Sequence, residues 1–309
     1  MTKKSKKTSA SPRRHLAMSG STLLVVVVLA AVPALVWALG RSGSDEAGRP
    51  NAAPEPGVAH VHGLGVNPAD GSLYVATHTG TFRIPAQGQA ERVGESYQDT
   101  MGFTVAGPDR FLGSGHPDVP SLKAGKPPLL GLIESTDAGK TWTSVSLSGE
   151  ADFHALAFTH GRVYGWDSTS GRFMVSDDLT SWDTRSTLRL FDFAVDPAAP
   201  DHVVAASPEG LLDSVDGGRT WRAVDSPGLV ALSWDPEMGL WGVESDGTVH
   251  RREQTAATWQ RVGGLPGQPE ALLARDGVLY AAALEDGTTG IYRSDDDGAT
   301  WRLVYRDEP

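Results

Sequence analysis

The sequence predicts an all-β protein, a six-bladed β-propeller with four-stranded blades, placed after an N-terminal transmembrane helix. Three observations support this prediction. An eight-residue pattern, S-x-D-x-G-x-T-W, occurs three times, beginning at Ser135, Ser214 and Ser294. Short segments with strand character recur in units of about forty residues, the spacing typical of propeller blades. No helix of useful length is expected after Leu39.

The chain begins with three segments that are not part of the repeat. Residues 1–21 form a basic tail, and residues 22–39 carry no charge over a length sufficient for a transmembrane helix. Because the basic flank comes first, the positive-inside rule places the N-terminus in the cytoplasm. Residues 40–57 are a linker rich in Pro and Gly. We expect a single-pass protein of the cell membrane with an extracellular propeller.

A cleaved signal peptide is the alternative interpretation of the apolar segment, because Val36-Trp37-Ala38 resembles a small-residue cleavage site. The propeller would then be secreted. The membrane is a partner through residues 22–39 if that segment stays as an anchor, and under both interpretations the remaining chain functions outside the cytoplasmic membrane.

Composition excludes several classes of function. The formal net charge is −11, and all 38 acidic residues follow the basic tail. Such a body repels nucleic acid. The chain contains no Cys, so a disulfide framework and a thiolate metal site are excluded. We expect a monomer that binds a small ligand, a metal or a glycan.

The predicted propeller covers residues 58–309 and consists of six units. Its first strands align at 62–66, 101–105, 154–158, 191–195, 230–234 and 270–274. Its second strands align at 73–76, 111–113, 163–165, 203–205, 240–242 and 279–281. A seventh unit would require the linker as a strand, and the linker lacks strand character.

The eight-residue pattern predicts a turn that leads into a strand. Asp and Gly favour the turn, while Thr and Trp favour the strand that follows. The pattern resembles the Asp-box (BNR) repeat of sialidase-type β-propellers. That resemblance implies structural boxes remote from the ligand site, formed by Ser135, Asp137, Gly139, Trp142, Ser214, Asp216, Gly218, Trp221, Ser294, Asp296, Gly298 and Trp301. Degenerate copies stand at 176–182 and 258–259.

The resemblance also raises the question of sialidase activity, because residues 82–85 read Phe-Arg-Ile-Pro, similar to a sialidase motif. Alignment with the other repeats places this tetrapeptide on a third strand, away from the expected ligand face. Only Arg189 and Arg172 are candidates for the three arginines of a sialidase site. We therefore expect no exo-sialidase activity. Another glycoside hydrolase needs only two opposed carboxylates, for which Asp99, Asp152 and Glu270 are the candidates.

Histidines gather where the chemistry of a propeller is expected, at the start of the first strands and the end of the second. This set includes one thioether and consists of His60, His62, His78, Met101, His116 and His154. Imidazole nitrogens suit Cu or Zn, and a thioether favours copper. Acid–base catalysis beside Asp99 or Asp152, a polar binding floor, and histidines bonded only to backbone and water are the alternatives.

Three functions remain open from the sequence. The first is a module that binds a ligand or transition metal at the histidine-rich channel mouth. The second is a glycoside hydrolase that acts on extracellular glycans, and the third is an assembly factor that docks another protein. The insertion at 115–128 carries Lys123 and Lys126 and is predicted to cover the site.

Overall fold

The structure, a computed structural model, describes residues 57–85, 89–254 and 258–306. The predicted tail, membrane helix and most of the linker lie outside the described residues. Within those residues, no helix is long and apolar enough to cross a membrane.

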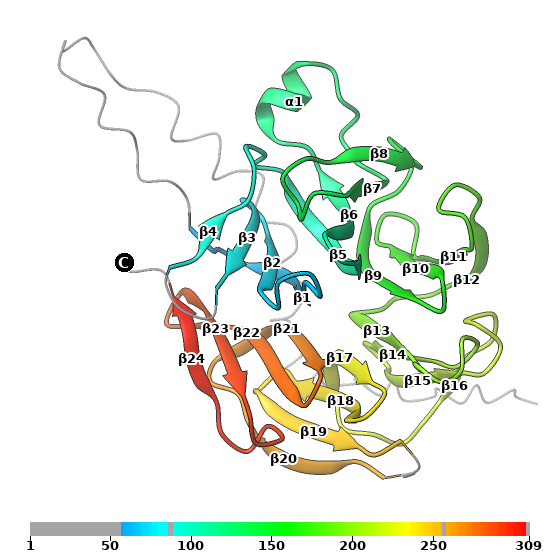
Figure 1. The fold of residues 1–309 in the computed structure, drawn as a ribbon. Coiled ribbons are helices and arrows are strands. Elements are labelled where there is room, and N and C mark those ends of the chain that lie inside the picture. The colour runs from blue at the N-terminus through cyan, green and yellow to red at the C-terminus, as the bar shows by residue number, and fades with distance from the viewer. Residues whose placement is uncertain (1–56, 86–88, 255–257, 307–309) are drawn as a thin grey trace, which may run out of the picture. The chain divides into compact units, whose positions relative to one another are not determined.

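The described chain forms six sheets of four antiparallel strands each, which confirms the predicted six-bladed propeller (Figure 1). Blade 1 contains β1 (Val61–Val66), β2 (Leu73–Thr77), β3 (Gly80–Ile84) and β4 (Glu91–Arg92). Blade 2 contains β5 (Asp99–Gly107), β6 (Arg110–His116), β7 (Leu132–Ser135) and β8 (Thr143–Ser146). Blade 3 contains β9 (Phe153–Thr159), β10 (Arg162–Asp167), β11 (Arg172–Ser176) and β12 (Asp183–Thr187).

The second half of the ring repeats the same plan. Blade 4 contains β13 (Asp192–Val195), β14 (Val203–Ser207), β15 (Gly210–Ser214) and β16 (Arg222–Ala223). Blade 5 contains β17 (Leu229–Asp235), β18 (Gly239–Glu244), β19 (Thr248–Arg252) and β20 (Gln260–Gly264). Blade 6 contains β21 (Gln268–Arg275), β22 (Val278–Glu285), β23 (Thr288–Ser294) and β24 (Arg302–Arg306).

The hydrophobic core lies between the blades. Six apolar clusters occur in the described part of the chain, and each joins two neighbouring blades. Between blades 1 and 6, for example, Val61 and Val75 pack with Ile291. Each blade therefore buries both faces against its neighbours, because a twisted sheet with two apolar faces needs a cover on each side.

No sheet combines a strand from the start of the described chain with strands from its end, because every sheet consists of four consecutive strands. Closure of the ring depends on the apolar cluster between blades 1 and 6 and on Glu270. One oxygen of Glu270 accepts the Val61 N–H at 3.1 Å and the Thr289 hydroxyl at 3.1 Å.

The three predicted turns have the same hydrogen bonds. In the first, the Ser135 hydroxyl donates to Asp137 at 2.8 Å and accepts the Gly139 N–H at 2.8 Å. Asp137 accepts the N–H of Thr141 at 2.9 Å and its hydroxyl at 2.7 Å. The copies at Ser214 and Ser294 reproduce these bonds. The three turns follow the third strands of blades 2, 4 and 6, at the end opposite to the histidines.

Two further predictions can be placed. The Phe82–Pro85 tetrapeptide lies on and just after β3, where Arg83 pairs with Asp70 at 3.1 Å, so its position on a third strand is confirmed. The insertion carries a short helix, α1 (Val119–Lys123), none of whose residues is buried. Figure 1 shows α1 at the periphery of the ring, beyond blade 2, rather than over its centre.

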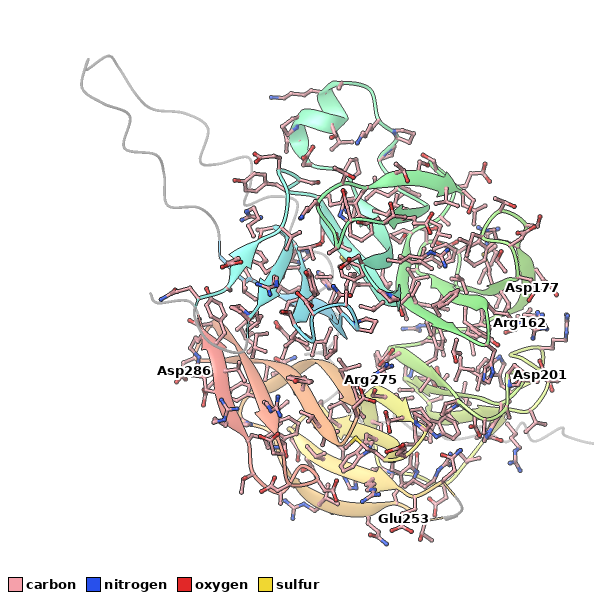
Figure 2. The ribbon with its side chains drawn as sticks, viewed as in Figure 1. Arg162, Asp177, Asp201, Glu253, Arg275 and Asp286 are labelled. Atoms are coloured by element: carbon pink, nitrogen blue, oxygen red, sulfur yellow. The ribbon has the colours of Figure 1, made fainter. Side chains whose placement is uncertain are left out.

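Ion pairs on the outer surface also link neighbouring blades. Arg162 of blade 3 lies 2.6 Å from Asp177 in its own blade and 3.7 Å from Asp201 in blade 4 (Figure 2). These side chains are substantially exposed, and exposed pairs contribute little to stability. The apolar clusters between blades therefore provide most of the stability of the ring.

Candidate functional site

The candidate site lies at one mouth of the central channel, where first strands begin and second strands end. His62 is on β1, His78 directly follows β2, and Asp99 begins β5. His116 ends β6, and Asp99 is its Cα partner in the ladder. Antiparallel pairing thus brings residues distant in sequence to the same end of blades 1 to 3.

Three ligand-type atoms from two blades form a compact triangle. His78 Nδ1 lies 2.8 Å from Asp99 Oδ1 and 3.3 Å from His62 Nε2, and His62 Nε2 lies 3.6 Å from Asp99 Oδ1. Ligand atoms around a tetrahedral Zn²⁺ with bonds of ~2.0–2.1 Å lie roughly 3.3 Å apart. The spacing of the triangle is compatible with a first coordination shell, and without a metal its 3.3 Å edge is a hydrogen bond between His62 and His78.

The Oδ1 atom of Asp99 supports this interpretation. It is buried and, among the described residues, has no partner in hydrogen-bond geometry, although His78 Nδ1 is close. A buried carboxylate oxygen without a hydrogen bond is costly unless a cation or another donor satisfies it. A cation at the centre of the triangle would satisfy this atom in addition to its contact with His78.

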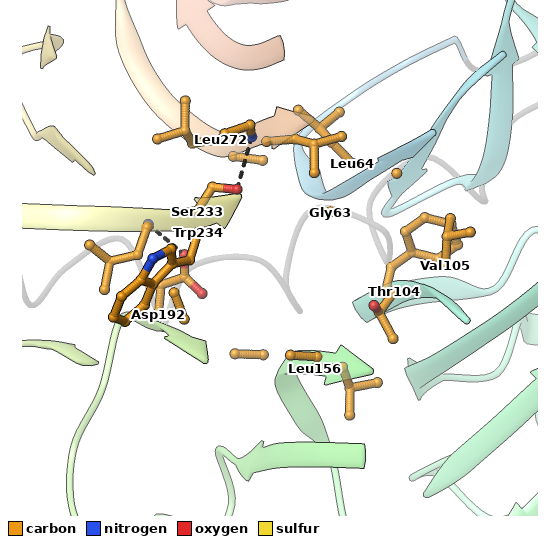
Figure 3. A pocket seen from close by; sticks show the side chains of 18 of the residues that line it. Gly63, Leu64, Thr104, Val105, Leu156, Asp192, Ser233, Trp234 and Leu272 are labelled. Atoms are coloured by element: carbon orange, nitrogen blue, oxygen red, sulfur yellow. Dashed lines mark hydrogen bonds between the residues drawn. The ribbon is translucent and has the colours of Figure 1, made fainter. Parts of the chain in front are cut away.

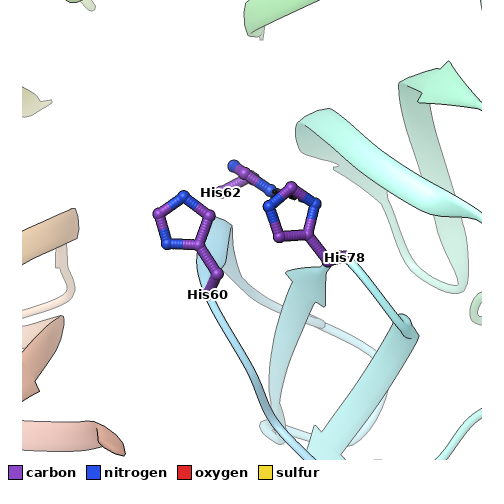
Figure 4. Close-up of side chains that lie close together, drawn as sticks. All are labelled: His60, His62 and His78. Carbon is purple, nitrogen blue, oxygen red and sulfur yellow. Dashed lines mark hydrogen bonds between the residues drawn. The ribbon is translucent and has the colours of Figure 1, made fainter. Parts of the chain in front are cut away.

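His60 adds a third imidazole beside the triangle (Figure 4). One ring nitrogen of His60 lies within 4.8 Å of those of His62 and His78. Its Nδ1 lies 2.8 Å from Glu270 Oε1, so a proton on Nδ1 leaves Nε2 as the free ligand atom. Carboxylates commonly orient metal-binding histidines in this way.

The backbone of His60 is also unusual. Its φ is 50°, in the left-handed region that non-glycine residues rarely adopt. The Thr289 hydroxyl accepts the His60 N–H at 3.4 Å, and Glu270 holds the ring. Contacts from blade 6 thus maintain this conformation, and such strain is concentrated at functional sites.

A second group lies in blades 2 and 3 and is centred on Asp152, which is 3 % exposed. Its Oδ2 atom lies 2.8 Å from His154 Nε2 and 3.4 Å from His116 Nε2. The Nδ1 of His116 donates to the carbonyl of Pro128 at 2.9 Å. The last residue of the insertion at 115–128 thus fixes the orientation of the His116 ring. The Oδ1 atom of Asp152 is buried and unpartnered among the described side chains.

Burial and neighbouring charge set the protonation of these groups. Burial, reinforced by the neighbouring histidines, lowers the pKa of His62 to about 2, so this ring is neutral at ordinary pH. The hydrogen bond to Asp152 raises the pKa of His116 to about 9, which makes it a cation at neutral pH. Burial opposes ionisation of Asp152, but both histidines hold its pKa below the usual range.

The mouth opens into a cavity of about 690 Å³ along the propeller axis (Figure 3). Met101 lines the cavity beside His62 and His154. Phe191 of blade 4 lines the same cavity and is exposed. The histidines of the mouth come from blades 1 to 3, and blade 6 contributes Glu270.

The structure brings the predicted residues into two groups. His60, His62 and His78 meet Asp99, whereas His116 and His154 meet Asp152. Glu270 bonds to His60 and the backbone of Val61. The metal and catalytic roles of these residues stay predictions. Sequence reasoning missed that Glu270, Thr289 and Pro128 orient the histidines, because side-chain bonds between blades leave no periodic signal.

Comparisons with known proteins agree on the fold. No protein-family model matches the chain. A curated relative, the dispase autolysis-inducing protein of Streptomyces mobaraensis, is 28 % identical over 197 residues, which are 63 % of this chain and 47 % of that protein. The chain thus spans about half the length of the curated relative it matches.

Two solved structures illustrate the structural similarity. An ancestral GH74 enzyme matches with a TM-score of 0.53 and 15 % identity, over 82 % of this chain and 39 % of that one. A chain of a nidogen/laminin complex matches with a TM-score of 0.59 and 13 % identity, over 77 % of this chain and 93 % of that one. The propeller fold is thus shared with glycoside hydrolases and with other proteins.

Proposed function

We propose that this protein binds a transition metal, zinc or copper, through His62 Nε2, His78 Nδ1 and Asp99 Oδ1, with His60 as an additional ligand. The single observation that carries the proposal is the triangle of 2.8, 3.3 and 3.6 Å formed by these atoms. Glu270 acts as the positioning residue that holds the His60 ring.

The donor set suits both metals. Imidazole and carboxylate ligands bind Zn²⁺ and Cu²⁺, and the thioether of Met101 at the same cavity favours copper over zinc. His62 is neutral at ordinary pH, and Asp99 contributes an oxygen atom, Oδ1, 2.8 Å from His78 Nδ1. Metal binding replaces the hydrogen bond between His62 and His78 and competes with protonation of His60, whose pKa is raised chiefly by its hydrogen bond to Glu270.

Equilibrium metal analysis tests this proposal. After addition of Zn²⁺ or Cu²⁺ and removal of excess, the wild type should retain about one equivalent, with a raised melting temperature. His78→Ala should lose at least about tenfold in affinity, since removal of even an outer-shell partner costs ~10–100-fold. His160→Asn is the matched control, because its imidazole lies outside the mouth and Asn tolerates its φ of 54°. Equal metal retention by His78→Ala and His160→Asn, or no metal retention by the wild type, would exclude the metal site.

The cellular location of the protein and its superfamily are also proposals. We infer that residues 22–39 anchor the propeller to the cell membrane with residues 58–309 outside, or that the propeller is secreted after cleavage. We further infer that the chain belongs to the Asp-box propellers of the sialidase-like superfamily. The repeated hydrogen bonds of the three turns and the spacing of the repeat support this assignment.

A second candidate function is glycoside hydrolysis, supported by the fold similarity to a GH74 enzyme and by two carboxylates at one mouth. Glycoside hydrolysis needs a pair of carboxyl groups that flank the substrate, and Asp99 and Asp152 would form this pair. A panel of chromogenic glycosides should then show turnover that falls at least ~10²-fold in Asp152→Asn. The exposed Asp225→Asn is the control. Absence of turnover in the wild type counts against this candidate.

A further inference from the structure

A carboxylate lies inside the central channel, apart from the histidine-rich mouth. Asp192 begins β13 and lines the cavity (Figure 3). It occupies the second position of the aligned first strands, where every other blade has Gly or Ala: Gly63, Gly102, Ala155, Ala231 and Ala271. A side chain at these positions points towards the next blade, which lies at a short distance. A Cβ at Gly102 would lie 2.4 Å from the Phe153 carbonyl oxygen.

The carboxylate of Asp192 joins blade 4 to blade 5. Its Oδ2 accepts the Leu232 N–H at 2.8 Å, from the exposed edge of β17. Its Oδ1 accepts the N–H of Phe193 at 2.8 Å. The side chain thus satisfies the Leu232 N–H, which would otherwise face the channel without a partner. Each oxygen keeps a lone pair that can accept a further hydrogen bond.

A carboxylate is not needed for that structural task. In blade 5 the hydroxyl of Ser233 accepts the Ala274 N–H of blade 6 at 2.8 Å. In blade 2 the hydroxyl of Ser114 accepts the Phe153 N–H of blade 3 at 2.9 Å. A neutral hydroxyl therefore satisfies an inter-blade N–H equally well, and Asp192 adds a negative charge that the architecture does not require.

No cationic side chain among the described residues contacts Asp192. The other ionisable groups that line the cavity are His62, His154 and Glu270 at the mouth and Asp235 and Arg275 towards the other end. Arg275 pairs with Asp276 at 3.1 Å and lies at the inner edge of blade 6 (Figure 2). Asp235 accepts backbone N–H groups. The charge on Asp192 is thus uncompensated within this part of the protein.

We propose that Asp192 is the binding point for a small positively charged group that enters the channel. Such a group is either a protonated amine on a short aliphatic stem or a monovalent inorganic cation. The walls around Asp192 suit an aliphatic stem, because Leu156, Trp234 and Leu272 line the same cavity. The charged group would lie against the two free lone pairs and replace the missing counter-ion.

The ionisation of Asp192 agrees with this geometry. Burial raises the pKa of Asp192 to about 7, although the N–H groups of Leu232 and Phe193 oppose the rise. The carboxyl therefore gains its charge near neutral pH and should bind a cation above that pH more strongly than below it.

Thermal unfolding of the full chain tests the proposal at pH 8. n-Butylammonium chloride at ~10 times its dissociation constant should raise the melting temperature of the wild type. This increase should be about 3–5 °C larger than the increase that the same salt causes in Asp192→Asn. The Asn amide oxygen keeps the acceptor for Leu232, and Asp192→Ser copies Ser233 should the first variant fold poorly. Asp225→Asn, at an exposed position, is the matched control and should behave as the wild type.

Parallel measurements identify the cation and separate this site from the metal site. An effect of butylammonium alone identifies an amine, and an equal effect of sodium chloride identifies an inorganic cation. At pH 5.5 the difference between wild type and Asp192→Asn should disappear. Asp192→Asn should still retain Zn²⁺, and His78→Ala should still respond to the cation. An identical response of wild type and Asp192→Asn at pH 8 would overturn the proposal.

Discussion

At the residue scale, the surroundings of each histidine decide whether its imidazole is a ligand or a charge. His62 is buried among other imidazoles and stays neutral, whereas His116 faces Asp152 and is charged. Both rings lie at the same mouth, but they are suited to different tasks. A neutral ring can bind a metal, and a charged ring stabilises a carboxylate or attracts an anion.

The charge on His116 predicts a pH dependence of stability. Its pKa of about 9 in the folded chain exceeds ~6.5 in the unfolded chain. The stabilisation is therefore complete below the unfolded value and is lost as the pH rises through about 9. Because the ring is 41 % exposed, the effect should be roughly 1 kcal/mol or less.

Urea unfolding at pH 6 and pH 9.5 measures this contribution. The wild type should lose more free energy of unfolding between these values than His116→Gln, which cannot titrate in this range. His160→Asn should follow the wild type. Parallel losses in wild type and His116→Gln would show that the His116–Asp152 contact has no net effect.

The residue types at the mouth were predictable from the sequence, but their partners were not. His60 and His62 were placed on one face because strand side chains alternate with a period of two, and His78 joined them because it follows the end of a second strand. The grouping of Asp99 with these histidines depends on the relative rotation of neighbouring blades, whereas Asp152 and His154 are two residues apart in one blade. That rotation follows from side-chain packing between blades, for which one sequence provides no local pattern.

At the element scale, the box turn is the most regular feature of the fold. Its Ser hydroxyl is buried and satisfies the Gly N–H, while its Asp organises the backbone that leads to the Trp. The turn could be predicted in full because all its hydrogen bonds lie within eight residues. The inter-blade bonds of Ser233 and Asp192 span about forty residues and could not be predicted in the same way.

Removal of the box serine should therefore weaken the fold without affecting the mouth. Ser135→Ala leaves the buried Gly139 N–H without its acceptor, which should cost ~1–3 kcal/mol of unfolding free energy. Urea unfolding and zinc titration of the same sample measure both properties. The exposed Ser148→Ala is the control. A loss of zinc affinity with unchanged stability would contradict the structural role of the turn.

At the scale of the whole propeller, the ring creates a mouth that no single blade contains. Glu270 in the last blade orients His60 before the first strand, so ring closure and the orientation of one candidate ligand depend on the same side chain. The blade number was predictable because the repeat is visible in the sequence. The mode of closure was not, since it depends on packing between the first and last blades.

The central claim is that a metal binds between His62, His78 and Asp99, with His60 beside them. X-ray absorption spectroscopy of the protein loaded with one equivalent of Zn²⁺ tests it most directly. We expect a first shell of nitrogen and oxygen at ~2.0–2.1 Å with two or three imidazoles, and one imidazole fewer in His78→Ala. A spectrum of hydrated zinc, or one that is unchanged in His78→Ala, would contradict the claim.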